Sequence, residues 1–179
     1  MTQIPTLSFS DLAAHLLRSM LLAREGDLRE SLLVRQGRGS FHLSAAGHEG
    51  VAAIAPHVRA DDIVFPAYRD RALMHALGMT VEETARDFFA REESTSGGRN
   101  LPGHFSSRRL NVFSVTSPVG AQCLPAVGAA WAFANEGKDA VAFCHIGDAA
   151  TLPNEQTFAE VALAGKQHAA KEMCRKVGK

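Results

Sequence analysis

The sequence predicts an α/β fold: a mostly parallel sheet with helices on both faces, preceded by a long helix. First, residues 140–146 form a short, nearly continuous apolar run, which is typical of a strand buried on both faces of a parallel sheet. Second, helical patterns come before and after this run, and strands that alternate with helices favour parallel pairing. Third, apolar residues recur at helical spacing over residues 11–36, before the first strand candidate.

The composition indicates one globular domain. The chain has 179 residues, of which 46% are hydrophobic, so it can bury a core. Its 19 basic and 19 acidic side chains cancel. There is therefore no electrostatic argument for binding nucleic acid or an anionic membrane surface.

Neither a targeting segment nor a membrane span is apparent. The first residues lack the basic and apolar regions of a signal peptide, and no apolar stretch is long enough to cross a bilayer. Cys123, Cys144 and Cys174 are odd in number and widely spaced, which fits neither a disulfide framework nor a zinc site. These features predict a cytoplasmic protein in a reducing compartment.

The first helix is expected from Asp11, capped by Ser10, to about Gln36, with Gly37 just past its end. Its apolar residues repeat at helical spacing and predict a face that packs in the core or against another subunit. They are Leu12, Leu16, Met20, Leu21, Leu28, Leu32 and Val34.

A polar loop with several glycines, residues 37–50, leads to a second helix from about His48 to Pro56 or His57. Residues 63–65 are a short apolar strand candidate. Pro66 stops this strand because proline cannot donate a ladder hydrogen bond.

The next helical pattern ends at Gly78. Thr80 and Glu83 then form a capping box that opens a further helix, ending near Arg91. The irregular section at 92–116 has a mix of Gly, Arg, His and Ser that would suit an anion or a cofactor. It shows little apolar content to bury, which predicts mobility without a cofactor.

Unusually small residues fill the helix expected around 126–134, and they would allow close packing against a sheet or another copy. The strand at 140–146 follows, and Gly147 and Asp148 come directly after it. A polar loop then leads to a helix from about Glu155. No internal repeat or second domain is visible.

Gly147 and Asp148 can be interpreted in two ways. An Asp at the carboxyl end of a parallel strand lies where such sheets bind ligands, and it can supply an oxygen to a hard metal ion. The N-terminus of the following helix would face a diphosphate. An isolated Gly-Asp pair also fits an ordinary strand-end turn, so this pair leaves both interpretations open.

Four stretches in order resemble one family. They are F-P-A-Y-R-D at 65–70, R-N-L-P-G-H-F at 99–105, T-S-P-V-G-A-Q at 116–122 and G-D-A at 147–149. The chain resembles the alpha subunit of the thiamine-diphosphate-dependent, decarboxylating component of the 2-oxo acid dehydrogenase complexes. The second and third stretches look most like the branched-chain members.

The resemblance implies a cofactor site. Tyr68 and Arg69 match the pair that reaches the diphosphate of thiamine diphosphate, and an arginine fork suits phosphate oxygens. Ser117 and Val119 match residues that contact the aminopyrimidine ring. None of these residues is expected to be catalytic by itself, because the carbanion chemistry belongs to the cofactor.

The resemblance also implies metal sites. Asp148 matches the magnesium-binding acid, and Gly147 and Ala149 flank it as cofactor contacts, with Ala149 in place of the family's glycine. A potassium ion is held around the third stretch in branched-chain relatives, and three residues match its ligands: Thr116, Pro118 and Gln122. Ala121 stands where those relatives would use a hydroxyl.

The implied activity is oxidative decarboxylation of a branched-chain 2-oxo acid, of the 3-methyl-2-oxobutanoate type, with transfer of the acyl group to a lipoyl arm. The implied partners are the beta subunit of the same component, which would supply an activating Glu, and the lipoyl acyltransferase core. No nucleic acid or membrane partner is implied.

The end of the chain departs from the family. An Asn-Asn pair normally closes the metal motif further along, but Lys176 and Val177 stand in its place. We therefore expect a single partial thiamine-diphosphate-binding domain, residues 1–179, which is the N-terminal half of the family subunit, with a divergent basic tail at 169–179. Such a chain would be inactive alone. The alternative is a truncated, non-catalytic fragment or subunit-packing module that binds no metal.

Overall fold

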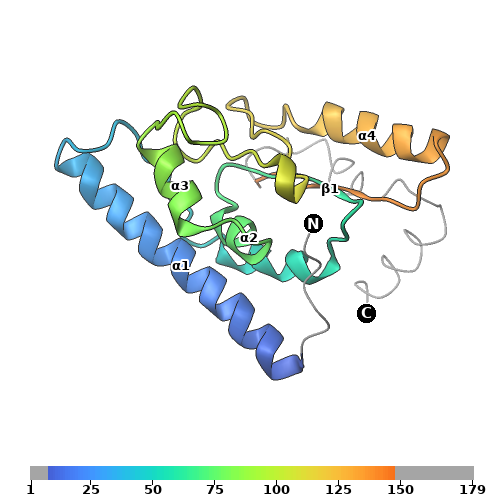
Figure 1. Cartoon of the computed structure of the whole chain (residues 1–179), viewed down its shortest axis with the longest axis horizontal. Helices are drawn as coiled ribbons and strands as arrows, with labels where there is room; N and C mark the ends of the chain where they lie inside the picture. The colour runs from blue at the N-terminus through green and yellow to red at the C-terminus, as the bar shows by residue number, and fades with distance from the viewer. Residues whose placement is uncertain (1–7, 148–179) are drawn as a thin grey trace.

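The computed structural model describes residues 8–147 (Figure 1). The predicted site residues Asp148 and Ala149, the helix expected from Glu155 and the tail at 169–179 lie outside the described residues. In chain order the elements are α1 (Phe9–Arg35), η1 (Glu49–His57), β1 (Ile63–Phe65), α2 (Arg71–Ala76), α3 (Val81–Phe88), η2 (Arg108–Leu110), α4 (Cys123–Asn135) and β2 (Ala142–Cys144).

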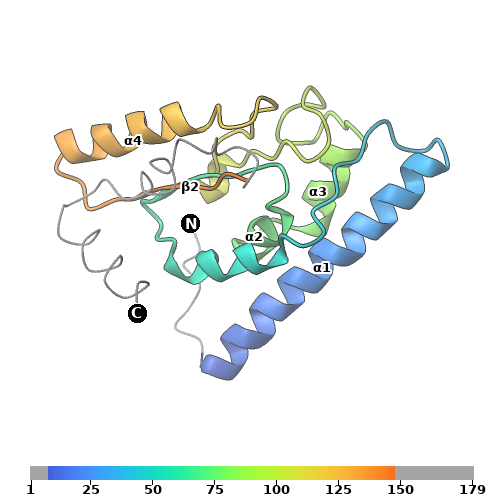
Figure 2. The same cartoon turned by 180° about the vertical axis from the view of Figure 1, so that it is seen from behind.

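The predicted long helix is present as α1, which lies along the outer edge of the described chain in both views (Figures 1 and 2). Its cap is Ser8, whose hydroxyl accepts a hydrogen bond from the backbone N–H of Asp11 at 3.2 Å. The predicted cap, Ser10, is therefore wrong by two residues, since Ser8 provides the same chemistry one half-turn earlier. The helix ends at Arg35, and Gly37 follows with φ +69°.

The capping box before α3 is confirmed. The Thr80 hydroxyl accepts from the Glu83 N–H at 3.1 Å, and the Glu83 carboxylate accepts from the Thr80 N–H at 2.7 Å. These two bonds satisfy donors that the helix itself leaves unpaired. The sequence predicted this start correctly because the box depends only on two residues three positions apart.

The two strands pair in parallel, as predicted. Ile63 lies opposite Ala142 and Phe65 opposite Cys144. The apolar run at 140–146 is longer than the strand it forms, because only Ala142–Cys144 is paired in register with β1. Parallel strands need a crossover connection, and here it runs through α2, α3 and α4.

Helices cover both faces of this sheet, which confirms the predicted layering (Figure 2). Successive strand residues point to opposite faces. Val64 is buried in a cluster with Leu73 and Met74 of α2, whereas Phe65 packs with Ala126 and Ala130 of α4. The small residues of α4 let it approach the sheet closely.

The irregular section at 92–116 contradicts one expectation. We expected little apolar content to bury, yet Phe105, Leu110, Val112 and Val115 are all buried in the main core. Val112 also bridges to Val64, next to the sheet. The error arose because these apolar residues lack a regular period, so they show no helix or strand pattern.

Among residues 8–147, no helix is both long enough and apolar enough to cross a membrane.

Candidate functional site

The carboxyl ends of β1 and β2 meet at one edge of the sheet because the strands are parallel. The segment 66–70 leaves β1 there, and residues 145–147 leave β2. A hydrogen bond of 3.0 Å from the N–H of His145 to the carbonyl oxygen of Phe65 continues the ladder past the strands. Two of the predicted motifs, with Tyr68 and Gly147, are thus brought side by side.

Asp70 and His145 lock these two segments together. His145 Nδ1 lies 2.7 and 2.8 Å from the two carboxylate oxygens of Asp70, which is fully buried. The Asp70 carboxylate also accepts from the Ala67 N–H at 2.8 Å. The hydrogen bond to Asp70 raises the pKa of His145, despite an opposing effect of burial.

Arg69 is held by the loop that follows α1. Its Nη1 donates to the carbonyl oxygen of Ser44 at 2.8 Å, and the Ser44 hydroxyl in turn donates to Asp27 of α1 at 2.9 Å. The guanidinium carbon lies 5.9 Å from the ring centre of Tyr68. Within the described residues, the other Arg69 nitrogens and the Tyr68 hydroxyl make no hydrogen bond, so these donors can serve an anion.

Ser117 joins the same region through a buried histidine. Its hydroxyl lies 2.8 Å from Nε2 of His104. His104 Nδ1 faces the carbonyl oxygens of Leu101 and Pro102 at 3.2 and 3.3 Å. Carbonyls only accept, so Nδ1 carries the proton, and Nε2 accepts from the Ser117 hydroxyl. The rings of His104 and Tyr68 are stacked, with centres 6.4 Å apart.

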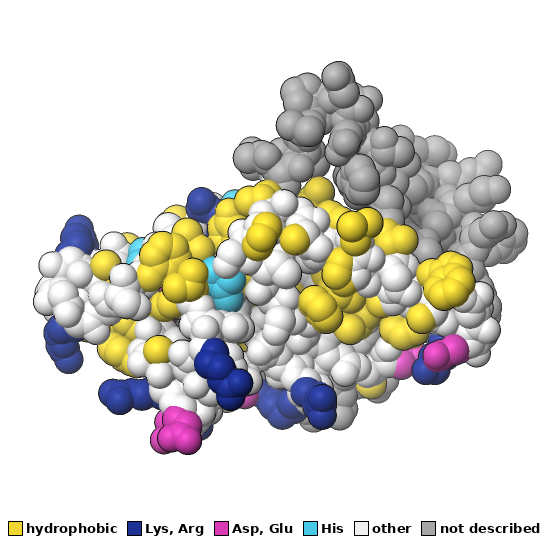
Figure 3. All heavy atoms as spheres, turned by 90° about the horizontal axis from the view of Figure 1, so that it is seen from above, with side chains coloured by type: hydrophobic (Ala, Val, Ile, Leu, Met, Phe, Trp, Pro, Cys, Tyr) yellow, Lys and Arg dark blue, Asp and Glu magenta, His cyan; other side chains and the backbone are white. Residues whose placement is uncertain are grey.

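Of the residues predicted for the cofactor, Tyr68, Arg69 and Ser117 therefore lie in one connected region, and Gly147 follows β2 at the same sheet edge. Val119 is 60% exposed. Figure 3 shows further apolar side chains on the face that carries α4, and the exposed ones on this helix are Leu124, Val127 and Trp131.

The residues predicted for potassium are partly engaged with one another. The Thr116 hydroxyl donates to the Pro118 carbonyl oxygen at 3.3 Å. The Gln122 side-chain nitrogen donates to the His145 carbonyl oxygen at 2.8 Å, which leaves its amide oxygen free of a hydrogen bond within the described residues. Between residues 8 and 147, no group of three or more His, Cys, Asp or Glu side chains is arranged to hold a metal ion.

Sequence reasoning missed His104, Asp70 and His145 as parts of this region. Each lay in or beside a recognised motif: His104 within 99–105, Asp70 directly after Arg69, and His145 two residues before Gly147. This position in or beside a motif was the one signal in the sequence that could have marked these three residues as part of the site. What each side chain contacts depends on residues far away in sequence.

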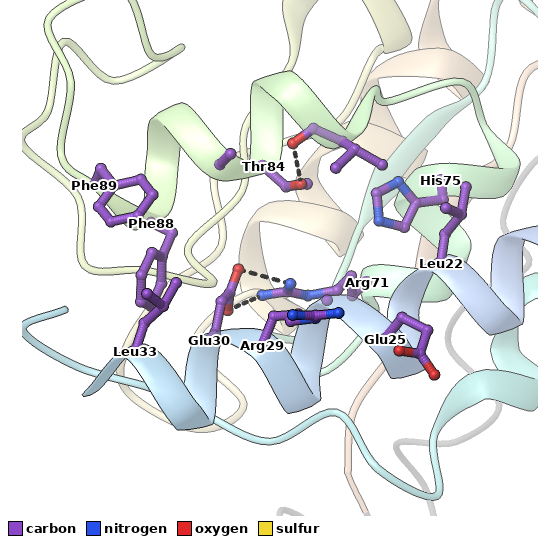
Figure 4. Close-up of a pocket in the computed structure, with 13 residues that line it drawn as sticks. Leu22, Glu25, Arg29, Glu30, Leu33, Arg71, His75, Thr84, Phe88 and Phe89 are labelled. Carbon is purple, nitrogen blue, oxygen red and sulfur yellow. Dashed lines mark hydrogen bonds and ion pairs between the residues drawn. The ribbon is translucent and has the colours of Figure 1, made fainter. Parts of the chain in front are cut away.

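A separate cavity of about 270 Å³ lies between α1, α2 and α3 (Figure 4). None of the predicted site residues lines it. At its wall, Arg71 Nη1 donates to Glu30 Oε1 at 2.7 Å, and the second nitrogen of the fork pairs with the other oxygen. Gly26 gives this guanidinium room to pass α1, because a Cβ there would lie 2.9 Å from Arg71 Nη1.

Comparisons with known proteins agree with the resemblance. The family model described as the dehydrogenase E1 component matches residues 17–170. The chain is 39% identical over 151 residues to a protein of Bacillus subtilis named 2-oxoisovalerate dehydrogenase subunit alpha, covering 83% of this chain and 45% of that protein. It is 31% identical over 150 residues to the subunit alpha of Pseudomonas aeruginosa, covering 81% and 37%.

A third relative is the mitochondrial subunit alpha 2 of Arabidopsis thaliana, which is 36% identical over 118 residues, covering 65% of this chain and 25% of that protein. The chain thus spans less than half the length of these curated relatives.

Proposed function

Because the chain belongs to the dehydrogenase E1 component family, we propose that it carries the diphosphate-binding part of the alpha subunit of a branched-chain 2-oxo acid dehydrogenase. Its similarity to proteins named 2-oxoisovalerate dehydrogenase subunit alpha supports the branched-chain substrate class. The name "subunit alpha" also supports a beta subunit as a partner, and we extend this proposal to the lipoyl acyltransferase core.

The observation that carries the proposal is the set of free donors at the sheet edge. One nitrogen of the Arg69 guanidinium is fixed on the carbonyl oxygen of Ser44. The remaining nitrogens can therefore donate to an anion without the side chain losing further conformational freedom on binding. The Tyr68 hydroxyl lies on the adjacent residue. These donors fit a diphosphate, and we assign Tyr68 and Arg69 to hold it. Gly147, Asp148 and Ala149 would complete the site, with Asp148 as a ligand of magnesium.

Thiamine diphosphate, when bound, supplies the carbanion chemistry that removes carbon dioxide from a 2-oxo acid. The role of the chain's own residues is to bind and orient this cofactor. His104 holds the Ser117 hydroxyl in one direction, and we assign Ser117 and Val119 to the wall against the aminopyrimidine ring. Asp70 and His145 keep the two strand-end segments at a fixed separation, so that the donors on both stay in register.

Calorimetry with thiamine diphosphate and magnesium tests the proposal. We expect measurable binding to the 179-residue chain, and a loss of about ten- to a hundredfold in Arg69→Ala, because a hydrogen bond to a charged group contributes about 1.5–3 kcal/mol. Arg86→Ala is the matched control, since Glu82, on the surface of α3, is the one residue that Arg86 pairs with in the described part of the chain. Asp148→Ala should remove the dependence on magnesium.

A chain that binds neither ligand, or an Arg69→Ala variant that binds as tightly as the Arg86→Ala control, would favour the non-catalytic alternative. Decarboxylation of 3-methyl-2-oxobutanoate should require a matching beta chain. Turnover by this chain alone would contradict the proposed division of roles between the subunits.

A further inference from the structure

Asp27 is a buried carboxylate of α1, and no lysine or arginine in the described part of the chain forms an ion pair with it. A buried charge is costly unless hydrogen bonds compensate for it. Here the loop that follows α1 supplies them. Oδ2 accepts from the Ser44 hydroxyl at 2.9 Å, Oδ1 accepts from the Ala45 N–H at 2.7 Å, and Nε2 of His42 lies 3.5 Å from Oδ1. Asp27 therefore anchors this loop to the helix.

One peptide group connects Asp27 to Arg69. The N–H of Ala45 and the carbonyl of Ser44 belong to the same peptide group, which is planar, so the two point in opposite directions. The N–H donates to Asp27, and the carbonyl oxygen accepts from Arg69 Nη1 at 2.8 Å. An anion and a cation are thus bound at the two ends of one amide. Hydrogen bonds in such a chain polarise one another, and a charged partner strengthens each of them.

This arrangement fixes Arg69 and leaves most of its guanidinium available. A direct pair with a carboxylate is frequently bidentate and would occupy two donors of the fork. Through the peptide group, Asp27 occupies none of them, and Arg69 gives up one nitrogen to Ser44. The direction of that carbonyl decides where the arginine lies. It is set by the bond on the other side of the same peptide plane, which reaches back to α1.

We propose that Asp27 is a positioning residue for the anion site, because it holds the Ser44–Ala45 peptide in the orientation that fixes Arg69. The proposal rests on the proposed function of Arg69 as a diphosphate ligand. Without the carboxylate, the Ala45 N–H loses its acceptor and the peptide group can turn. Arg69 then loses its fixed acceptor and has to be ordered by the ligand itself, which opposes binding.

Calorimetry with thiamine diphosphate and magnesium tests the coupling between the two residues. Asp27→Ala should weaken binding by about three- to tenfold, the cost of immobilising one side chain with many rotamers. In a chain that already carries Arg69→Ala, the same substitution should cause no further loss, because Asp27 acts through Arg69. Two losses that simply multiply would overturn the proposal.

Two variants separate positioning from a general loss of stability. In Asp27→Asn the amide oxygen can still accept from the Ala45 N–H and the amide nitrogen can donate to the Ser44 hydroxyl oxygen, so binding should return to within about twofold of the wild type. Asp62 is the matched control: it is also buried and accepts from the Val141 N–H at 2.7 Å, but at the amino ends of β1 and β2. Asp62→Ala should lower stability and leave the affinity of the folded chain unchanged. An equal loss of affinity in Asp62→Ala would assign the effect of Asp27 to stability alone.

An NMR measurement without ligand keeps this inference separate from the proposed function. The order parameter of the Arg69 Nε–H should lie above about 0.6 in the wild type and in Asp27→Asn, and it should fall below about 0.6, the range of flexible groups, in Asp27→Ala. A low value in the wild type, or an unchanged value in Asp27→Ala, would overturn the role of Asp27.

The two measurements fail in different ways. If the wild-type chain binds no cofactor, or if Arg69→Ala binds as tightly as the wild type, the proposed function fails, and the order parameters still decide whether Asp27 holds Arg69. If Arg69→Ala weakens binding and Asp27→Ala does not, the positioning role alone fails. Should Asp27→Ala not fold by circular dichroism, Ser44→Ala takes its place in both experiments, because it removes one of the two hydrogen bonds that Asp27 accepts from the loop.

Discussion

Two glycines within helices should respond to alanine with opposite signs. Gly26 lies in the middle of α1, and Gly128 lies in the middle of α4. Alanine in place of glycine in a helix interior normally stabilises by about 1 kcal/mol, because glycine loses more backbone freedom on folding. At Gly128 an added Cβ meets no atom within 4 Å, so Gly128→Ala should show most of this gain.

At Gly26 the added Cβ would lie 2.9 Å from Arg71 Nη1. The far end of an arginine normally moves aside at little cost. Here Arg71 is buried and bonded by both nitrogens of its fork to Glu30, so relief requires losing or bending at least one of these bonds. A hydrogen bond between charged groups contributes about 1.5–3 kcal/mol. Against the gain of about 1 kcal/mol, Gly26→Ala should destabilise by about 0.5–2 kcal/mol.

Urea unfolding followed by far-ultraviolet circular dichroism measures both variants. If the slope of the free energy against urea stays constant, the shift of the midpoint gives the change in stability. Gly128→Ala should move the midpoint up and Gly26→Ala should move it down. Equal stabilisation by both substitutions would refute the reasoning, because it would show that the Glu30–Arg71 pair gives way freely.

Two further predictions concern pH. Asp87 lies in α3, and burial raises the pKa of its carboxyl to about 6. Between about pH 4 and 6 the folded chain therefore holds a proton that the unfolded chain has released. The stability of the fold should fall as pH rises through this window. Asp87→Asn, which can still accept from the Gly103 N–H, should flatten this fall in urea titrations at pH 4.5 and 7; an unchanged slope would contradict the assignment. The pKa of His145 is raised by its bond to Asp70, so that bond stabilises the fold below the unfolded value of about 6.5 and the benefit is lost as pH rises through the folded pKa. Asp70→Asn should lower the pKa of His145 in an NMR titration. An unchanged pKa would show that the hydrogen bond to Asp70 does not stabilise the protonated form of His145.

Many features of this chain could be predicted because they depend on neighbours in sequence. The Thr80 box, the strand at 63–65 and the long first helix all appear within a few residues of their expected places. Side-chain periodicity and capping chemistry act between residues at most four positions apart, so they do not depend on how the rest of the chain folds. The identity of the family likewise rests on four short motifs in a fixed order.

The side chains that fix Tyr68, Arg69 and Ser117 could not be predicted in this way. Arg69 is held by the carbonyl of Ser44, and a backbone acceptor has no residue signature. His104 links Ser117 to Tyr68 across segments that only the fold brings together.

The sequence by itself determined the elements, their order and the family, since these follow from local periodicity and short motifs. The tertiary structure alone decided which side of α1 faces inward. Periodicity identifies an apolar stripe but not its partner, and both faces of α1 carry leucines. Leu16 packs on the main core, whereas Leu17 and Leu21 remain exposed. That choice depends on buried charges contributed by another element: Glu30 must turn inward to meet Arg71 of α2, because an unpaired buried charge costs more than exposed leucines do.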